Sequence, residues 1–498
     1  METGKRSGLN VLTSLAYQVI LLVSGFLVPK ILLGAYGSEV NGLVSSLTQL
    51  IGYIAIVEAG LGGAAIYALY QPLSDSDYSL INRIVSTTKA LYIQVGNIFS
   101  VLLLLLAIIY PLFINIHNIS FWEMALLIVA LGMRSIFDFY SLAKYRTLLT
   151  ADNRLYIIQI SLILYQILNT AIIVFLSLNN VSVLLVYWAA LLPIFARTLF
   201  LNLYVKRRYT FLDTSLSSEP KLMSDRWNVL FLNLVQSAQG AGPTLIATAV
   251  LGLVSVSIYS VYNVVFSGIV MLLTMITNSL QATFGQKIVN NKRLANITFL
   301  KFDYFFGQAV AAISAISVVM IIPFIKLYIG TSHESGYYDT ILGTLMGINL
   351  LFFAGKAPTG MLVMAAGHYK QTRIQSAIQA TVLLIAGFLF SIQWGLYGLI
   401  IGMILSNFYR WVDLTWYVPK KIFETDLKKQ VKHSGLMLFT FIASLSLFLK
   451  LDAQTNATDW VAWFTLGIKN LFLSIMVSFF VTVVTERKYV QKLFLLRK

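Results

Sequence analysis

Few ionisable side chains lie inside the long apolar stretches of this chain, and most of them are basic. Arg134, Arg197 and Lys356 lie within such stretches, and Lys30 and Arg410 also belong to this group. A cation within a membrane is costly and usually faces a bundle interior or an aqueous cavity. Guanidinium and ammonium groups form strong, charge-assisted bonds to phosphate oxygens. These five residues are therefore the candidate binding site for a diphosphate in a cavity.

Local ion pairing is the structural alternative for some of these cations. Arg134 precedes Asp138 by one helical turn, and Arg410 precedes Asp413 by three residues, so each pair can neutralise itself. Lys30 and Arg410 can instead extend to the membrane interface. Arg197 and Lys356 have no local carboxylate partner, so for them a cavity role and a structural role remain equally open.

The acidic residues within apolar stretches are equally rare. Glu58 lies among small residues in "IVEAGLGGA" without a local partner. Its carboxylate can be uncharged, bridged to a cation, or part of a coupling-ion site. Asp138 is the second candidate for a coupling-ion site, with Na⁺, H⁺ or the membrane potential as the driving force. We expect no other cofactor and no metal.

Polar side chains also recur within the apolar segments. Their spacing often places them on one face of a helix, where interhelical hydrogen bonds are the structural alternative. Their number favours a hydrated cavity that contacts sugars, with the following candidate residues: Gln18, Asn233, Gln236, Tyr259, Tyr262 and Asn263.

Fourteen apolar stretches are long enough to cross a bilayer, which requires about 20 residues each. The expected helices cover residues 9–33, 40–69, 85–113, 120–146, 154–177, 181–204, 227–250, 255–284, 300–325, 338–364, 371–391, 394–418, 433–450 and 460–485. Lysine and arginine occur in alternate connecting segments: 28 of 36 lie on one side, and only Lys326 and Lys450 lie on the other. Because basic residues are retained in the cytoplasm, we expect both termini to be cytoplasmic.

The composition agrees with an all-α, polytopic membrane protein. The chain is 58% hydrophobic and 11% charged, with a net charge of +16. These basic residues flank the membrane segments, which favours lipid headgroups as their partners and argues against nucleic acid. There is no cysteine, and the four histidines fall at helix ends or in loops. No catalytic motif is present, so we expect a protein that is not an enzyme.

The longest polar gap divides the chain. We predict an N-terminal six-helix bundle over residues 1–205, a cytoplasmic linker over 206–226 and a second six-helix bundle over 227–419. Residues 420–498 would hold an interfacial segment over 420–433, a final helix pair and a basic tail. The motif "NVL" occurs at 10–12 and 228–230, each followed at the same spacing by Leu-Gly. Such an internal repeat is typical of a chain that contains two repeated bundles.

Four segments carry a resemblance to a known family: "VEAGLGGAAIYALYQPLSDSDYSLIN" (57–82), "YRTLLTADNRLYI" (145–157), "SVSIYSVYNVV" (255–265) and "AAGHYKQTR" (365–373). They resemble the Wzx-type polysaccharide flippases of the multidrug/oligosaccharidyl-lipid/polysaccharide exporter superfamily, in particular the capsule and exopolysaccharide members of Gram-positive bacteria. With the helix count, the resemblance covers residues 5–485.

The resemblance implies a flippase of the cell membrane. It would move undecaprenyl-diphosphate-linked oligosaccharide repeat units from the inner to the outer leaflet by alternating access, and a polysaccharide polymerase and a chain-length regulator are the implied partners. A multidrug-type exporter of the same fold is an alternative, although basic residues outnumber acidic ones within the membrane. A membrane polysaccharide polymerase is a further alternative, although the chain lacks a large external loop.

Overall fold

Helices account for nearly all of the described chain. The computed structural model describes residues 2–58, 61–116, 119–214, 216, 237, 239–330, 335–368, 370–451 and 457–486. Within these ranges there is no β-strand, and eleven helices are long and apolar enough to cross a membrane. The prediction of an all-α, polytopic membrane protein is confirmed.

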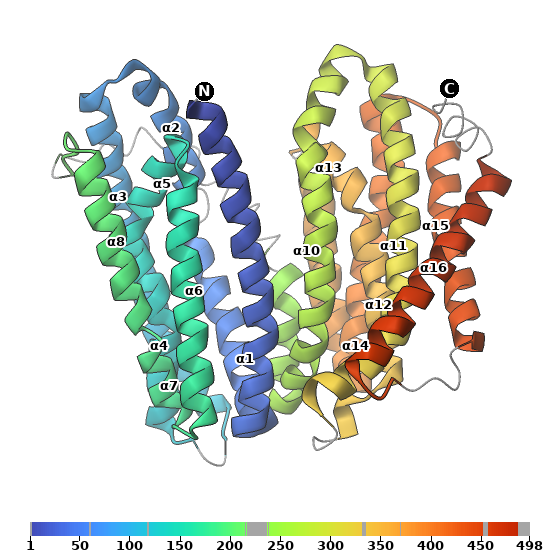
Figure 1. The fold of residues 1–498 in the computed structure, drawn as a ribbon, viewed down its shortest axis with the longest axis horizontal. Helices are drawn as coiled ribbons and strands as arrows, with labels where there is room; N and C mark the ends of the chain where they lie inside the picture. The colour runs from blue at the N-terminus through green and yellow to red at the C-terminus, as the bar shows by residue number, and fades with distance from the viewer. Residues whose placement is uncertain are drawn as a thin grey trace. The chain divides into compact units, whose positions relative to one another are not determined.

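The chain forms two compact units, residues 1–241 and 242–498. This division lies beyond the predicted linker, most of which lies outside the described residues, so the linker boundaries stay a prediction. The first unit, drawn in blue to green in Figure 1, contains α1 (Glu2–Ile54), η1 (Ala55–Glu58), α2 (Leu61–Asp75), α3 (Tyr78–Phe113), α4 (Phe121–Phe137), η2 (Asp138–Leu142), α5 (Ala143–Ala151), α6 (Leu155–Leu178), α7 (Val183–Ala189) and α8 (Leu192–Arg208).

The second unit follows the same all-helical plan. It contains η4 (Ala247–Leu251), α10 (Leu253–Asn290), α11 (Lys292–Ile329), η5 (Ser335–Tyr337), α12 (Thr340–Gly355), α13 (Ala357–Ala365), α14 (Arg373–Tyr417), η6 (Val418–Phe423), α15 (Lys428–Leu451) and α16 (Trp460–Thr485).

Two of the eleven candidate spans are in fact helix pairs. The 53 residues of α1 would measure about 80 Å as one helix, far more than the roughly 30 Å of a bilayer core. Gly37 interrupts α1 with a φ of 81°, and Gly395 interrupts α14 with a φ of 59°. Glycine adopts such positive φ values without a steric penalty. The predicted helix over 227–250 lies mostly outside the described residues. It would be the fourteenth membrane-spanning helix, and it stays a prediction.

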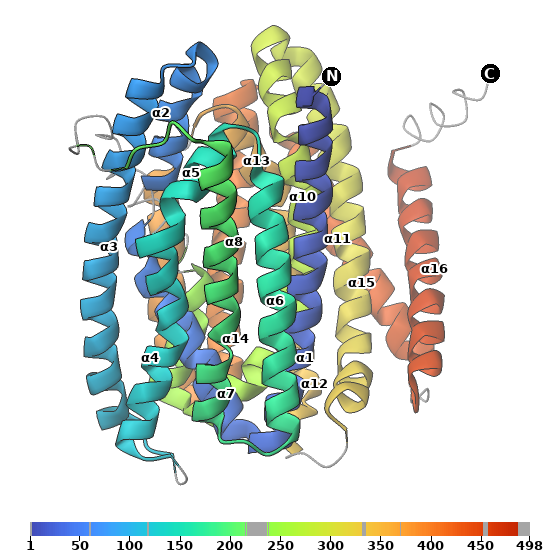
Figure 2. The ribbon, with the colours of Figure 1, turned by 60° about the vertical axis from the view of Figure 1, so that its left-hand side comes forward.

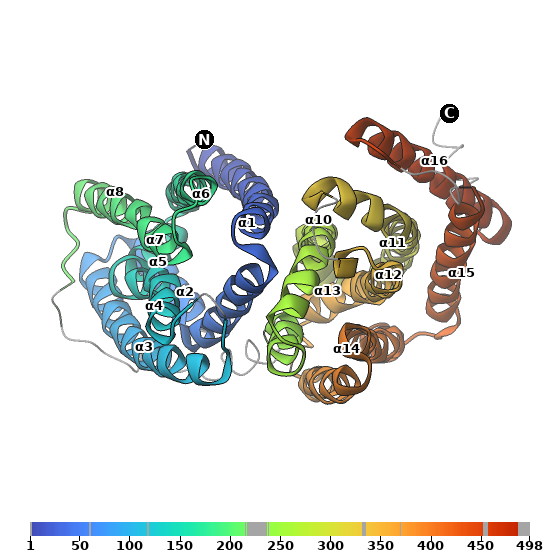
Figure 3. The same ribbon diagram turned by 90° about the horizontal axis from the view of Figure 1, so that it is seen from below.

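Neighbouring helices in each unit pack along much of their lengths. In the first unit α1 packs against α6, and the two run side by side in Figure 2. In the second unit α15 and α16 contact each other and both contact α11, as the view from below shows (Figure 3). The predicted final helix pair is therefore an integral part of the second unit.

The residues of the predicted interfacial segment, 420–433, do not form one separate helix, and its place at the membrane interface stays a prediction. Residues 418–423 continue α14 as a π-helical turn, and the chain turns at Glu424, whose φ is 55°. Ile422 and Phe423 are buried in an apolar cluster with Phe284 and Phe299. Ile422 and Phe423 thus belong to the protein core, whereas Val431 is exposed on α15, which begins at Lys428. The predicted basic tail, over residues 487–498, lies outside the described residues.

Candidate functional site

Arg197 has a carboxylate partner that its sequence neighbourhood does not reveal. Its Nη1 atom donates a 2.7 Å hydrogen bond to Oδ1 of Asp138, and its side chain is 4% exposed. Asp138 begins the π-helical turn η2, whereas Arg197 lies on α8. The sequence showed no local carboxylate partner for Arg197, and the structure supplies a distant one, because the two residues are 59 positions apart but adjacent in the fold. The Nε atom of Arg197 has no hydrogen-bond partner.

Arg134 is left without its expected partner. Asp138 is engaged by Arg197, and no carboxylate in the described part of the chain forms an ion pair with Arg134. The Arg134 guanidinium instead lies 4.8 Å from the ring centroid of Tyr165 on α6. Tyr17 of α1 is close enough to interact with it as well. An arginine over an aromatic face is weakly stabilised, and its hydrogen-bond donors are not saturated by a carboxylate.

Glu58 also has partners, and they lie far from it in the sequence. It forms an ion pair with Arg146 of α5 and accepts a 3.1 Å hydrogen bond from the Tyr92 hydroxyl of α3. Arg146 reaches the same hydroxyl at 3.5 Å. A carboxylate bound in this way is already compensated, which favours the bridged state among the three that the sequence left open.

These contacts place one basic cluster within the first unit. Arg146 and Arg197 are close enough for their charges to repel, and Asp138 lies near enough to Tyr165 and Arg134 to influence both. The cluster contains three arginines and two carboxylates, which are supplied by η1, α4, η2, α5 and α8. It carries an excess of one positive charge. A region with this charge balance attracts anions, and a phosphate oxygen can accept hydrogen bonds from the remaining guanidinium donors.

The second unit holds a different polar arrangement around Lys356, the residue between α12 and α13. Its Nζ atom donates a 2.6 Å hydrogen bond to Oδ1 of Asn407 and lies 4.7 Å from the ring centroid of Phe353. Asn407 in turn donates to Asn349 at 2.8 Å, and Gln379 donates to Asn407 at 3.2 Å. In the described residues no carboxylate forms an ion pair with Lys356. The amide groups solvate its charge but do not neutralise it.

Arg410 is engaged by Asp413 of the same helix, as one of the two alternatives predicted. The pair is 2.5 Å apart, and Arg410 is near enough to Lys356 for the two charges to repel. Arg410 therefore adds little net charge to the second unit. Lys30, the remaining predicted cation, is exposed on α1, and its thirteen-residue distance from Tyr17 places it about 20 Å further along that helix.

The predicted sugar-binding residues differ in accessibility. Tyr262 is fully buried, and its hydroxyl donates to the backbone carbonyls of Tyr337 and Asp339. Tyr259 is also buried, whereas Gln18 and Asn263 are half-buried. Tyr262 is thus a structural anchor for the segment before α12. The two other predicted residues, Asn233 and Gln236, lie outside the described residues.

One member of the basic cluster, Arg146, and its neighbour Tyr92 were not predicted from the sequence. Arg146 was assigned to a cytoplasmic connection because the expected helix ended there, but α5 continues to Ala151. Tyr92 is uncharged, so it was not among the charged residues considered as candidates. The spacing gave little signal, because Arg146 follows Arg134 by twelve residues and so lies about 120° away from it around an ideal helix.

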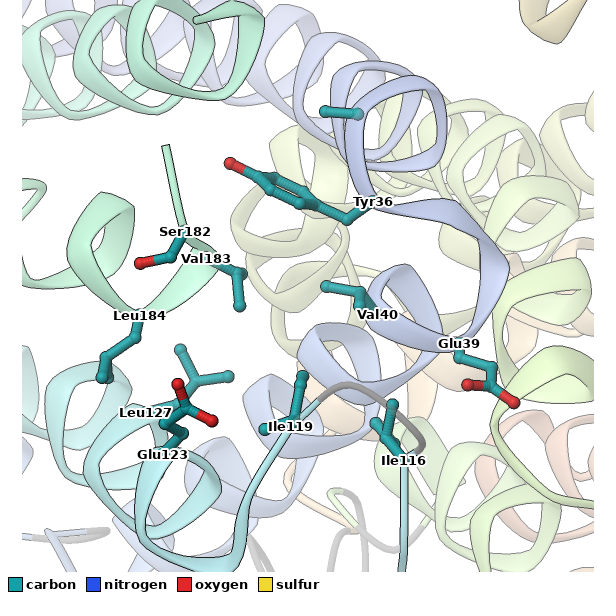
Figure 4. Close-up of a pocket in the computed structure, with 11 residues that line it drawn as sticks. Tyr36, Glu39, Val40, Ile116, Ile119, Glu123, Leu127, Ser182, Val183 and Leu184 are labelled. Carbon is teal, nitrogen blue, oxygen red and sulfur yellow. The ribbon is translucent and has the colours of Figure 1, made fainter. Parts of the chain in front are cut away.

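A separate cavity in the first unit does not suit an anion. It has a volume of 370 Å³ and is lined by residues of α1, α4 and α7, including Tyr36, Glu39, Glu123 and Ser182. Figure 4 shows Glu39 directed away from Tyr36. Two of the described lining residues are acidic and none is basic. Glu123 is also engaged at the N-terminus of α4, where it forms a capping box with Ser120 through hydrogen bonds. This cavity therefore has the wrong charge for a phosphate group.

Comparisons with known proteins reveal the fold. No protein-family model matches the chain, and no curated protein matches it. Among solved structures, the lipid II flippase MurJ in an inward closed conformation has a TM-score of 0.69 at 14% identity, over 97% of this chain and 99% of that one. An inward-facing multidrug resistance MATE transporter of the MOP superfamily has a TM-score of 0.65 at 14% identity, over 84% and 99%.

A third solved structure is also similar. It is a MOP superfamily transporter from Pyrococcus furiosus, for which a binding pocket of reverse polarity suggests a different function. Its TM-score is 0.55 at 15% identity, over 84% of this chain and 95% of that one. At these identities the likeness concerns the fold alone. The chain is a multi-pass membrane protein with the fold that the lipid II flippase MurJ and the MATE transporters share.

Proposed function

We propose that this protein is a flippase for undecaprenyl-diphosphate-linked oligosaccharide repeat units. It moves them from the inner to the outer leaflet of the cytoplasmic membrane by alternating access, for capsule or exopolysaccharide synthesis. The observation that carries this proposal is the basic cluster of the first unit, in which Arg134 has guanidinium donors that no carboxylate occupies. The similarity to the MurJ fold supports it.

The charge balance fits a lipid-linked diphosphate. Placing an unpaired cation within a membrane costs about 2.5–3.5 kcal/mol on insertion scales, so its presence needs compensation. A diphosphate supplies negative charge and several acceptor oxygens, and arginine binds such groups through two parallel hydrogen bonds. In the proposed cycle Arg134 and Arg197 bind the diphosphate within the first unit. Lys356 supplies a separate cation in the second unit, and roles for Lys30 and Arg410 stay predictions. Gln18, Tyr259 and Asn263 are the described candidates for contacts with sugars.

The drug-exporter alternative draws on the similarity to MATE transporters. Export of cationic drugs would favour a site with excess negative charge, since like charges repel. The two carboxylates of the cluster are each paired with an arginine, and one further arginine remains. The electrostatics therefore favour the anionic lipid-linked substrate over a cationic drug.

Transport by the purified protein tests the proposal. Proteoliposomes would carry a fluorescent undecaprenyl-diphosphate oligosaccharide, and a membrane-impermeant quencher would report the fraction in the outer leaflet. We expect Arg134→Gln to slow translocation about tenfold or more, because one charge-assisted interaction is lost. Arg134→Lys, which keeps the charge, should retain part of the activity. Lipid II and a cationic drug serve as alternative substrates in the same assay.

Deletion of the gene tests the same proposal in cells. Loss of the protein should stop surface polysaccharide and leave the lipid-linked unit on the cytoplasmic leaflet. Accumulation on the outer leaflet would instead indicate loss of a polymerase, the expected downstream partner together with a chain-length regulator. Unchanged surface polysaccharide, in a strain without a second flippase, would contradict the proposal.

A further inference from the structure

Asp303 is an acidic residue within a membrane-spanning helix. It lies on α11, eleven residues after Lys292 and therefore about 16 Å along the helix. Its Oδ2 atom accepts a 2.8 Å hydrogen bond from Nε2 of Gln430 on α15. No basic residue in the described ranges forms an ion pair with it. An ionised carboxylate in such a place is costly unless a positive charge compensates it, so Asp303 requires a proton or another cation.

Two neighbouring polar atoms lack hydrogen-bond partners. Gln430 is 2% exposed, and its Oε1 atom has no partner. His433, one turn further along α15, is 5% exposed, and its Nδ1 atom has none either. Buried polar atoms are nearly always hydrogen-bonded. Two unpartnered atoms beside an unpaired carboxylate therefore indicate that a small ligand belongs between them.

A small cavity joins these three side chains. Asp303, Gln430 and His433 line it together with three hydroxyl-bearing residues, Thr359, Thr415 and Ser434. Its free space is 10 Å³, about what one water-sized particle occupies. Most of the polar atoms in the lining side chains are oxygens, which hard cations prefer as ligands. The space thus fits one small cation and excludes a larger organic ligand.

We propose that Asp303 and Gln430, with the surrounding hydroxyl groups, bind a single monovalent cation, either a proton or Na⁺. One positive charge neutralises the single carboxylate, whereas a divalent ion would leave an uncompensated charge among apolar helices. The other ionisable groups around the cavity are already engaged with one another. Glu486 is paired with Lys432 at 2.5 Å and lies 3.8 Å from Nε2 of His433, and Arg410 is paired with Asp413 beside Trp411.

The position of the site gives binding a mechanical consequence. The site joins α11 to the first turns of α15 and is also lined by residues of α12, α13 and α14, so the bound cation is a bridge between five helices of one unit. On the proposed flippase function, occupancy of this bridge would couple an ion gradient to the movement of the second unit. Binding itself does not depend on that function, and it can be measured without any lipid substrate.

Sodium binding is the first measurement. Purified full-length protein in detergent would be equilibrated with ²²Na⁺ in a choline buffer, and bound sodium would be counted. Asp303→Asn, which preserves shape, should weaken binding about tenfold or more, because the only anionic ligand is lost. Asp426→Asn is the matched control, since Asp426 is exposed and does not line the cavity. It should bind sodium as the wild type does.

Proton binding is the second measurement. Infrared difference spectra between acidic and basic buffers would show the carbonyl stretch of a protonated carboxyl group within the membrane. If the cation is a proton, this band should be absent in Asp303→Asn and unchanged in Asp426→Asn. Gln430→Met retains the carboxylate but removes its amide partner, and it should weaken sodium binding or shift the pH midpoint of the band. The proposal is overturned if neither sodium binding nor such a band depends on Asp303 and Gln430.

Discussion

Arg197 and Asp138 form a 2.7 Å ion pair that joins α8 to the π-helical turn between α4 and α5. π-Helical turns occur frequently at functional sites, and here the turn begins at the carboxylate that compensates a buried arginine. The pair changes how mutations of Arg197 must be interpreted. Removing the arginine alone leaves Asp138 uncompensated, so a loss of transport could follow from instability rather than from lost substrate binding.

We therefore predict that a double variant distinguishes the effect of Arg197 on stability from its effect on transport. Arg197→Gln or Asp138→Asn alone should destabilise the first unit by about 3–5 kcal/mol, the usual cost of breaking a buried pair. The Arg197→Gln, Asp138→Asn double variant should recover most of this loss, as thermal unfolding in detergent would show. If the arginine binds the diphosphate, the recovered protein should still transport slowly. A double variant as unstable as the single ones would argue against the pair.

Lys356 should behave differently, because amides rather than a carboxylate surround it. We expect Lys356→Gln to change stability by less than about 1.5 kcal/mol, since its amide can still bond Asn407. Transport of the anionic lipid should fall, whereas Lys356→Arg should preserve it in part. Thermal unfolding and the proteoliposome assay on the same preparation measure both quantities. Wild-type transport by Lys356→Gln would remove Lys356 from the substrate site.

The orientation of the chain can be tested with single cysteines, because the natural chain contains none. We expect Asn115→Cys and Asn179→Cys to react with an impermeant maleimide in intact cells. Asn290→Cys and Thr425→Cys should react only after the membrane is opened. Asn115, Asn179 and Asn290 are exposed in the structure, so poor accessibility would not explain a failure to react at these positions. Labelling of Asn290→Cys in intact cells would reverse the assigned orientation. Ser215 and Ala453, the other predicted loop positions, lie outside the described residues.

Close backbone packing within α14 gives a stability prediction. A Cβ atom on Gly402 would lie 2.5 Å from the Cα and N atoms of Gly387, across the bend at Gly395. Backbone atoms cannot rotate away, so Gly402→Ala should destabilise the protein by about 1–3 kcal/mol, as overpacking does. Gly435→Ala is the control: that helical position is exposed and has no atom within 4 Å. It should be neutral or slightly stabilising in a thermal unfolding assay.

The sequence predicted the fold well because the bilayer simplifies the problem. A spanning helix must be long and apolar, and its connections carry lysine and arginine on one side. Both signals are local. The paired helices within α1 and α14 were separated correctly, near Gly37 and Gly395, because polar or small residues interrupt the apolar runs there.

The contacts within the site could not be predicted in the same way. Arg197 meets Asp138 across 59 residues and Glu58 meets Arg146 across 88, and such pairs depend on how the helices rotate and pack. Asp303 was overlooked because Lys301 precedes it, which made it resemble the polar edge of a helix. In the segment 420–433 the apolar residues suggested contact with lipid, but two of them, Ile422 and Phe423, are buried in one cluster with Phe284 and Phe299.

The glycine bends of the two units share one backbone conformation. Gly37 and Gly252 have almost the same backbone angles, with φ of 81° in both and ψ of −178° and 172°. Each precedes the second long helix of its unit, as expected if one ancestral gene was duplicated and fused. The two "NVL" motifs precede these bends by 27 and 24 residues. The difference is slightly less than one helical turn, so we expect that one copy gained or lost three codons in its first helix, and that Gly37 and Gly252, rather than Gly34 and Gly252, align the two halves.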